Sequence, residues 1–345
     1  MQNHHFYPGN HINNLVDSPY YKNLIKLRNL IALACDDYFQ DRKALKVDLY
    51  MLTKGASSPM GRGSDSKPIS LELGKQRLFL VDSAQFGMEP LVQKNFEMVY
   101  CYLPSFRGED SDYRHINQFY HCEAELRGGY TKAIEVATGL VKHLLNKICR
   151  GFTEKVFEFE NSNFEALREI LNKDFPSVTF DETCDLLEKN GYSSLVERYD
   201  YGRVITSEGE SRVIELVTGN KLPFWITRYD RDVVAFYQKP DPSNPDKVLN
   251  ADLILPSING SFGGEVLGLG QRQDNKDSLI ESMNRQGIKE IYSYKWYLDL
   301  RDRDDYTMTS GFGLGIERLL AWTLGIRSIA DVAIYPVLKS QETNY

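Results

Sequence analysis

The chain has 345 residues, enough for one large domain or two ordinary ones with a sizeable core. Its 41 basic and 48 acidic side chains give a net charge of -7, which argues against a general electrostatic attraction to nucleic acid but cannot exclude a local basic patch. No apolar run reaches the roughly 20 residues of a membrane-spanning helix, the first residues do not form a signal peptide, and five scattered cysteines favour reduced thiols, so we expect a cytoplasmic protein without a membrane partner.

Residues 1–20 form an N-terminal extension in our interpretation, and the first regular element follows it. Apolar residues recur at helical spacing from Tyr21 to Gln40, which predicts one long amphipathic helix. The segment from Lys54 to Ser66 is rich in Gly, Ser and Pro, which is typical of a mobile loop or a slack connector.

A hairpin with a charged loop is predicted next. Met98–Leu103 and Gln118–Leu126 have the composition and alternation of two strands, and the polar segment between them contains Arg107 and Arg114. The two guanidinium groups are suited to contact different phosphates of one nucleotide, with Phe119 stacking on its base. Alternatively, the loop is only a solvated hairpin tip.

The middle of the chain contains mainly helical patterns. Residues 132–147, 164–172 and 181–189 have helical periodicity, and we place a mainly helical insertion at about 150–200. Further on, the segment Asp241–Pro245 predicts a turn between strands.

Alternating glycines occupy Gly311, Gly313 and Gly315, directly before an apolar helix whose first turn contains Arg318. Glycine at every second position removes the side chains from one face of a strand, so that a flat ring such as adenine can lie on the backbone. Arg318 would then donate to a phosphate oxygen. A tightly packed strand-to-helix turn explains the glycines equally well, because such motifs occur by chance.

Together the hairpin and the glycine strand resemble motifs 2 and 3 of the class II aminoacyl-tRNA synthetases, most closely the asparaginyl enzymes of the aspartyl/asparaginyl subgroup. The likeness extends from about residue 22 to about residue 336. It implies an α+β fold, a class II synthetase-type antiparallel β-sheet flanked by helices, over residues 21–345. It also places a strand at Val47–Met51, within the motif that forms the family's dimer interface, so we expect a homodimer. A further strand is expected at Asp232–Tyr237.

The resemblance also implies the chemistry. Arg107 would contact the α-phosphate of ATP and the substrate carboxylate, and Arg318 the γ-phosphate. Glu265 and Asp252 would hold Mg2+. The remaining candidates for ATP binding are Glu109, Arg114, His115, Phe119, Gly313 and Gly315. Glu208 and Glu210 either border the site or form an exposed acidic turn.

The activated amino acid is predicted from Gln85, Glu89 and Arg272. In the family's register Gln85 binds the α-amino end, Glu89 accepts from the side-chain amide, and Arg272 donates to its oxygen. An acceptor and a donor together match asparagine. With aspartate, the carboxylate of the substrate side chain would lie beside that of Glu89. This repulsion costs roughly 4 kcal/mol at about 4 Å and an effective dielectric constant of about 20.

The acceptor of the activated acyl group stays open. Only about 20 residues precede the first motif, so we expect no anticodon-binding barrel. The chain would then transfer asparagine to a tRNA, or to another amine or thiol. The first alternative is an asparagine synthetase that acts on aspartate, ATP and ammonia. The second is a non-catalytic protein that senses an amino acid or a nucleotide.

Overall fold

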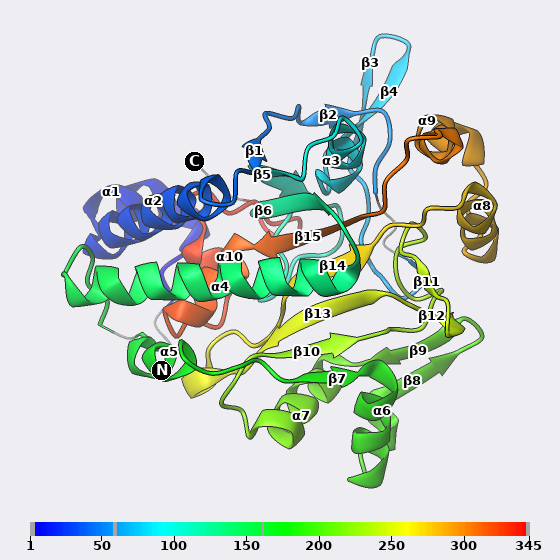
Figure 1. Ribbon diagram of the computed structural model, residues 1–345. Coiled ribbons are helices and arrows are strands. Elements are labelled where there is room, and N and C mark those ends of the chain that lie inside the picture. Colours follow the sequence, from blue (N-terminus) through cyan, green and yellow to red (C-terminus); the bar gives the residue numbers. More distant parts are fainter. Residues whose placement is uncertain (1–3, 58–60, 161, 343–345) are drawn as a thin grey trace.

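The computed structural model describes residues 4–57, 61–160 and 162–342 (Figure 1). Its α-helices are α1 (His11–Asp17), α2 (Pro19–Gln40), α3 (Gln85–Val92), α4 (Tyr130–Thr153), α5 (Phe164–Ile170), α6 (Phe180–Lys189), α7 (Ser207–Thr218), α8 (Lys276–Arg285), α9 (Lys295–Leu298) and α10 (Ile316–Thr323). Short 3-10 turns are η1 (Pro8–Asn10), η2 (Ser193–Leu195), η3 (Ile258–Gly260), η4 (Ile291–Tyr294), η5 (Asp299–Asp302) and η6 (Ile329–Val332).

The strands are β1 (Leu45–Lys46), β2 (Leu52–Thr53), β3 (Ser70–Leu73), β4 (Gln76–Leu80), β5 (Met98–Phe106), β6 (Gln118–Arg127), β7 (Ser177–Thr179), β8 (Val196–Tyr199), β9 (Gly202–Ile205), β10 (Phe224–Thr227), β11 (Pro240–Asp241), β12 (Asn244–Val248), β13 (Asn250–Leu255), β14 (Gly264–Gln271) and β15 (Thr309–Gly315). Eight of them form one sheet in the order β1-β5-β6-β15-β14-β13-β10-β7. The six inner strands are antiparallel to one another, and only the edge strands β1 and β7 pair in parallel. This α+β architecture confirms the fold class predicted from the sequence.

The two faces of the sheet differ because side chains alternate along each strand. In β15, Phe312 and Leu314 point into the main hydrophobic core, so Gly311 and Gly313 face the opposite side. Helices α2, α4 and α10 cover this face and contribute many of the other core residues, and α4 contacts β13, β14 and β15 directly (Figure 1). The helical face is therefore closed by packing, while the glycine face stays available for a ligand.

The long helix α2 confirms the prediction for residues 21–40. Ser18 caps its start by accepting a hydrogen bond from the Tyr20 amide at 3.3 Å, and Pro19 fits the first turn because its missing N–H has no helical partner there. The buried residues of α2 recur at helical spacing and pack on α4, as the sequence predicts. The predicted helices of the middle segment also form, as α4, α5 and α6.

Two expected strands are wrong. The short strand β1 ends at Lys46, and residues 47–50 do not continue it. The Val47 amide still donates to the Tyr100 carbonyl at 2.9 Å. Residues 231–237 form turns, since their backbone crosses from the sheet toward β11 instead of pairing with a strand. In both cases the composition favours a β-strand, but the segment does not pair with a neighbouring strand.

The segment at about 150–200 contains α5 and α6, but β7 joins the edge of the main sheet and β8 forms a hairpin with β9. The domain boundaries at residues 20 and 150–200 stay predictions. All five cysteines are unpaired and buried, in agreement with reduced thiols. Within the part of the chain that the structure describes, no helix combines the length and apolar character that crossing a bilayer requires.

Candidate active site

A polar cavity of about 460 Å³ lies on the glycine face of the sheet, and a smaller one of about 60 Å³ continues it. The two share their lining at Arg107, Arg114, Glu265 and Arg318. These residues come from the β5–β6 hairpin, β14 and α10, which are far apart in the sequence. The antiparallel sheet brings them together because β6, β15 and β14 are neighbours.

Four glycines of β14 and β15 lie on this face of the sheet, and we call them the glycine floor: Gly268, Gly270, Gly311 and Gly313. Gly268, Gly270 and Gly313 line the larger cavity, whereas the side chains of Glu125 and Arg272 cover Gly311. Side chains are excluded there by neighbouring groups. A Cβ on Gly311 would lie 1.9 Å from Glu125 Oε2 and 2.3 Å from an Arg272 nitrogen. The alternating glycines therefore make room for specific charged side chains as well as for a ligand.

The β5–β6 hairpin places its charged residues along the smaller cavity. Arg107 Nε is buried and has no hydrogen-bond partner among the described residues, and the guanidinium lies 5.3 Å from the centre of the Phe119 ring. Arg114 donates to Glu210 at 2.7 Å. Because a buried donor without a partner is costly, Arg107 is suited to a ligand oxygen.

Every residue predicted to bind ATP lines the smaller cavity: Glu109, Arg114, His115, Phe119, Gly313, Gly315 and Arg318. Arg318 donates to the Glu265 carbonyl at 2.9 Å and lies 3.3 Å from its carboxylate. His115 contacts Asp112 at 2.9 Å. Their convergence agrees with the prediction, and their individual roles stay predictions.

Two carboxylates converge over Gly268. A Cβ on this glycine would lie 3.2 Å from Asp252 Oδ1 and 3.3 Å from Glu265 Oε1. Burial and the nearby charge of Glu265 raise the pKa of Asp252 well above its usual value. Burial acts in the same direction on Glu265, but Arg318, Arg107 and Arg114 outweigh it and lower its pKa. Two like charges held this close are costly without a cation.

This donor set fits Mg2+, which prefers carboxylate oxygens and completes its shell with phosphate and water. Among the described residues no group of three or more His, Cys, Asp and Glu side chains has metal-binding geometry. Glu210 also lines the cavity, whereas Glu208 is exposed in the first turn of α7. The segment around Glu210 is thus a helix start capped by Thr206, which accepts from the Gly209 amide at 3.1 Å.

Of the predicted amino-acid-binding residues, Gln85 lines the other end of the cavity, whereas the buried Arg272 contacts Gln85 but does not line the cavity. Arg272 donates twice to Glu125, at 2.9 and 2.7 Å, and once to Gln85 Oε1. Gln85 Nε2 in turn donates to Glu123 at 3.3 Å. Burial raises the pKa of Glu123, a carboxylate that also accepts from Ser83 and the Ala84 amide.

The structure does not bring Glu89 to the cavity wall, contrary to our expectation. Its buried carboxylate accepts from Arg301 at 2.6 Å, from Tyr297 at 2.5 Å and from Tyr306 at 2.9 Å. With these three internal partners and only 1% of its surface exposed, Glu89 does not line the cavity and presents no acceptor to a substrate amide there. The physical reason is that α9 and the segment after it, distant in sequence, pack their donors against α3.

A loop and a hairpin form one wall. Gly63, Ser64 and Asp65 line the cavity beside Arg203 and the rest of β9. The loop lies where the sequence predicts it, although residues 58–60 lie outside the described part of the chain. The Gly63 amide donates to the Val233 carbonyl at 3.2 Å, which fixes the loop against the turns after β10.

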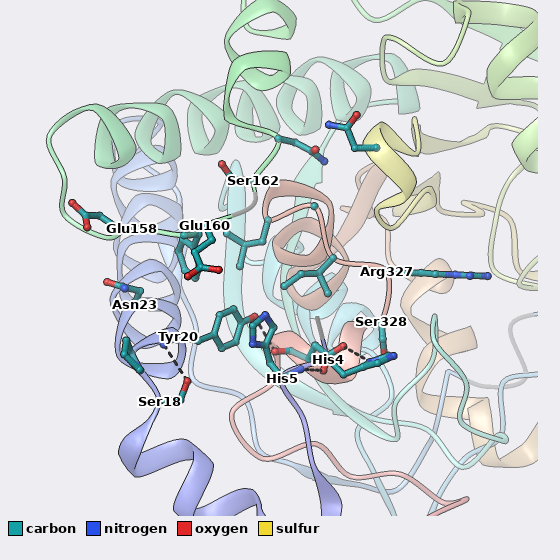
Figure 2. Close-up of a pocket in the computed structure, with 18 of the residues that line it drawn as sticks. His4, His5, Ser18, Tyr20, Asn23, Glu158, Glu160, Ser162, Arg327 and Ser328 are labelled. Carbon is teal, nitrogen blue, oxygen red and sulfur yellow. Dashed lines mark hydrogen bonds and ion pairs between the residues drawn. The ribbon is translucent and has the colours of Figure 1, made fainter. Parts of the chain in front are cut away.

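A second cavity of about 820 Å³ lies at the N-terminal segment, where His4, His5 and Tyr20 line it (Figure 2). His5 stacks on Tyr20 with ring centres 3.6 Å apart, and Asp331 accepts from the backbone amides of His5 and Phe6 at 2.8 and 2.7 Å. Although it is larger, it contains neither the glycine floor nor the converging arginines. We therefore place the candidate active site in the cavity above the glycine floor.

The sequence matches the family described as "tRNA synthetases class II (D, K and N)" over residues 9–339. The chain belongs to this family. It is 31% identical over 340 residues to an asparagine–tRNA ligase of Clostridium tetani, with 91% of this chain and 70% of the relative covered. A second asparagine–tRNA ligase, of Thermococcus kodakarensis, is 32% identical over 264 residues, covering 75% of this chain and 57% of the relative.

Solved structures of class II synthetases agree in fold. Asparaginyl-tRNA synthetase from Pyrococcus horikoshii, complexed with asparaginyl-adenylate, matches with a TM-score of 0.81 and 27% identity, covering 95% of this chain and 73% of that one. The Entamoeba histolytica asparaginyl-tRNA synthetase also has a TM-score of 0.81, at 21% identity, with 99% and 74% covered; at that identity the likeness concerns the fold alone.

Within this class II synthetase site, sequence reasoning missed Glu123 and Glu125. Both lie on β6, where Glu123 pairs with Gly313 and Glu125 with Gly311. Each glycine thus has a buried carboxylate on the neighbouring strand. The alternation of Glu123, Ala124 and Glu125 was the signal that could have found them, because alternate residues of a strand share a face.

Proposed function

We propose that this class II synthetase activates asparagine with ATP as the aminoacyl adenylate and transfers it to tRNA. The observation that supports this best is the meeting of Arg107, Glu265 and Arg318, from three distant segments, in one cavity that Gln85 also lines. The relatives named asparagine–tRNA ligase support asparagine as the substrate.

In the first step, an oxygen of the substrate carboxylate attacks the α-phosphorus of ATP. A bond from carboxyl oxygen to phosphorus forms, the bond to the β-phosphate oxygen breaks, and pyrophosphate leaves. The carboxylate is already ionised at neutral pH, so no general base is needed. Arg107 reduces the repulsion between the two anions, and Arg318 holds the end of the triphosphate.

Glu265 and Asp252 are the residues that would hold Mg2+, and the ion would supply positive charge toward the departing pyrophosphate. Glu123 offers a buried carboxylate to the substrate's α-ammonium group, next to Gln85. In the second step the acceptor hydroxyl of tRNA attacks the acyl carbon and AMP leaves.

Homodimerisation and a cytoplasmic location stay predictions. Several large apolar side chains on α1, on α2 and after β1 are exposed, with Val16 at 76%, Leu33 at 56% and Tyr50 at 88%. A second copy that covers them would remove apolar surface from water. Sedimentation at several protein concentrations measures the assembly state.

Pyrophosphate exchange tests the proposed activity. We expect exchange with asparagine and ATP, not with aspartate, and transfer of labelled asparagine to tRNA. Ammonium-dependent formation of asparagine from aspartate would instead indicate the synthetase alternative, and ligand binding without exchange the sensing alternative. Neither alternative is favoured, since the relatives are ligases and the arginines are in place.

Replacing Arg107 by alanine should lower exchange by about 100- to 1,000-fold, the usual effect of removing one donor to a developing charge. Thermal unfolding of Arg107→Ala should match that of the wild type, because its Nε has no internal partner among the described residues. Retained exchange in the folded variant would exclude the mechanism above.

A further inference from the structure

Gln238 lies on the glycine floor. It lines the cavity, follows Tyr237 in the turns after β10, and forms an isolated antiparallel bridge with Arg272. A Cβ placed on Gly270 would lie 3.0 Å from Gln238 Cγ and Cδ and 3.2 Å from its Nε2. The side chain of Gln238 therefore covers Gly270 directly, at the end of the cavity that Gln85 lines.

The amide oxygen of Gln238 has no donor among the described residues. Three buried side-chain atoms of cavity-lining residues lack a hydrogen-bond partner in that part of the chain: Arg107 Nε, Arg114 Nε and Gln238 Oε1. The first two are donors near the phosphate end, and Gln238 Oε1 is an acceptor. A buried acceptor left unpaired is destabilising, so a ligand N–H that donates to it gains binding energy.

Other acceptors at this end are already engaged. Gln85 Oε1 accepts from Arg272, both Glu125 oxygens accept from Arg272, and Glu89, which does not line the cavity, accepts from Arg301 and two tyrosines. The acceptor that the sequence assigns to Glu89 must therefore come from another residue, and Gln238 presents one inside the cavity.

We propose that Gln238 determines substrate specificity by accepting a hydrogen bond from the side-chain amide of the amino acid. This inference rests on the proposed function, in which asparagine is activated. Aspartate has no N–H to offer, and its carboxylate would lie on a floor flanked by Glu123 and Asp252, whose oxygens lie 3.1 and 3.2 Å from Cβ positions on Gly313 and Gly268. A site built around an unpaired acceptor selects against a substrate that cannot satisfy it.

The test compares pyrophosphate exchange by the wild type, Gln238→Leu and Gln286→Leu. Gln286 is a matched control, because its Oε1 is also buried without a partner among the described residues and its Nε2 donates to the Val234 carbonyl at 2.8 Å, but it does not line the cavity. We expect Gln238→Leu to raise KM for asparagine about 10- to 100-fold, with a smaller change in kcat. Gln286→Leu should leave both within twofold.

Gln238→Glu keeps an acceptor and adds a negative charge. It should retain exchange with asparagine and reject aspartate more strongly than the wild type, and it decides the question if Gln238→Leu does not fold. An asparagine KM within twofold of wild type in folded Gln238→Leu, or aspartate exchange gained by Gln238→Glu, would overturn the inference and leave the proposed function standing. Absence of asparagine exchange in the wild type would overturn the proposed function itself, and this inference with it.

Discussion

At the scale of single residues, the absence of a side chain at Gly311 decides how the amino-acid end of the site is built. Its position lies opposite Glu125 in the β15–β6 register, and the Arg272–Glu125 pair fills the space above it. Both partners are almost fully buried, at 2% and 0% side-chain exposure. A buried ion pair tolerates little displacement, because separated charges in a poorly solvated site are costly.

Gly311→Ala should therefore lower stability by about 1–3 kcal/mol and weaken asparagine binding, since its Cβ would lie 1.9 Å from Glu125 Oε2. Urea unfolding and the KM for asparagine measure the two effects. Gly9→Ala is the control, because no atom lies within 4 Å of a Cβ there. Equal stability of the two variants would show that the ion pair adjusts freely.

At the scale of elements, the loop around Arg62 and the β8–β9 hairpin hold each other. The Arg62 guanidinium lies 4.3 Å from the centre of the Tyr201 ring and contacts Asp200 at 3.3 Å. Tyr201 is stacked on Tyr199 with ring centres 4.9 Å apart. Because the next residues of the loop line the cavity, these contacts position part of the wall.

Arg62→Ala should raise KM for asparagine several-fold while changing stability by less than about 1 kcal/mol, as expected for an exposed cation–π contact and ion pair. Steady-state kinetics and thermal unfolding check this. Arg198→Ala, which removes only the Glu188 contact at the outer side of the same hairpin, should leave KM unchanged. An equal rise of KM in both variants would show that the effect comes from the β8–β9 hairpin as a whole and not from the Arg62 contacts.

The same hairpin is tied to the sheet through Asp230, which accepts from Lys247 at 2.6 Å and from Arg203 at 2.8 Å. Burial opposes ionisation of Asp230, but these hydrogen bonds outweigh it and lower its pKa to about 2. In an unfolded chain the pKa of an Asp carboxyl group is about 3.9. The stabilisation is therefore complete above about pH 4 and is lost as the pH falls through about 2.

Between pH 5 and pH 2, the wild type should lose roughly 2 kcal/mol more stability than Asp230→Asn, which has no charge to titrate. Urea unfolding of both proteins across this range measures the difference. Identical pH dependence would mean that Asp230 is not ion-paired in solution.

At the scale of the whole molecule, the first and last parts of the chain meet beside the second cavity. Besides the His5 and Phe6 amides, Asp331 contacts the His4 ring at 3.2 Å, and its carbonyl accepts from Tyr20 at 2.9 Å (Figure 2). Four contacts on one residue join η6, the N-terminal segment and α2. The N-terminal extension predicted from the sequence is thus packed onto the catalytic domain.

Asp331→Ala should lower stability by about 2–4 kcal/mol, since it leaves two backbone amides without their acceptor and removes a buried side chain. The same loss should speed hydrogen exchange at the His5 and Phe6 amides. Unchanged exchange at both would show that another group holds the segment.

The sequence by itself determined the fold class, and it predicted which residues meet in the smaller cavity. The long α2 stripe, the β5–β6 hairpin and the β15 glycines are local patterns of period or composition, so the order of residues along the chain is enough to identify Arg107, Arg318 and Glu265. Val47–Met51 and Asp232–Tyr237 failed because a strand needs a partner that composition does not specify.

Only the tertiary structure decided the amino-acid end. Arg301 and Tyr297, more than 200 positions from Glu89, donate to its buried carboxylate, and the absence of a side chain at Gly270 leaves room for Gln238. Hydrogen bonds between residues so far apart leave no periodic trace in the sequence. Which acceptor faces the substrate is therefore a property of packing, whereas which residues can accept is a property of the sequence.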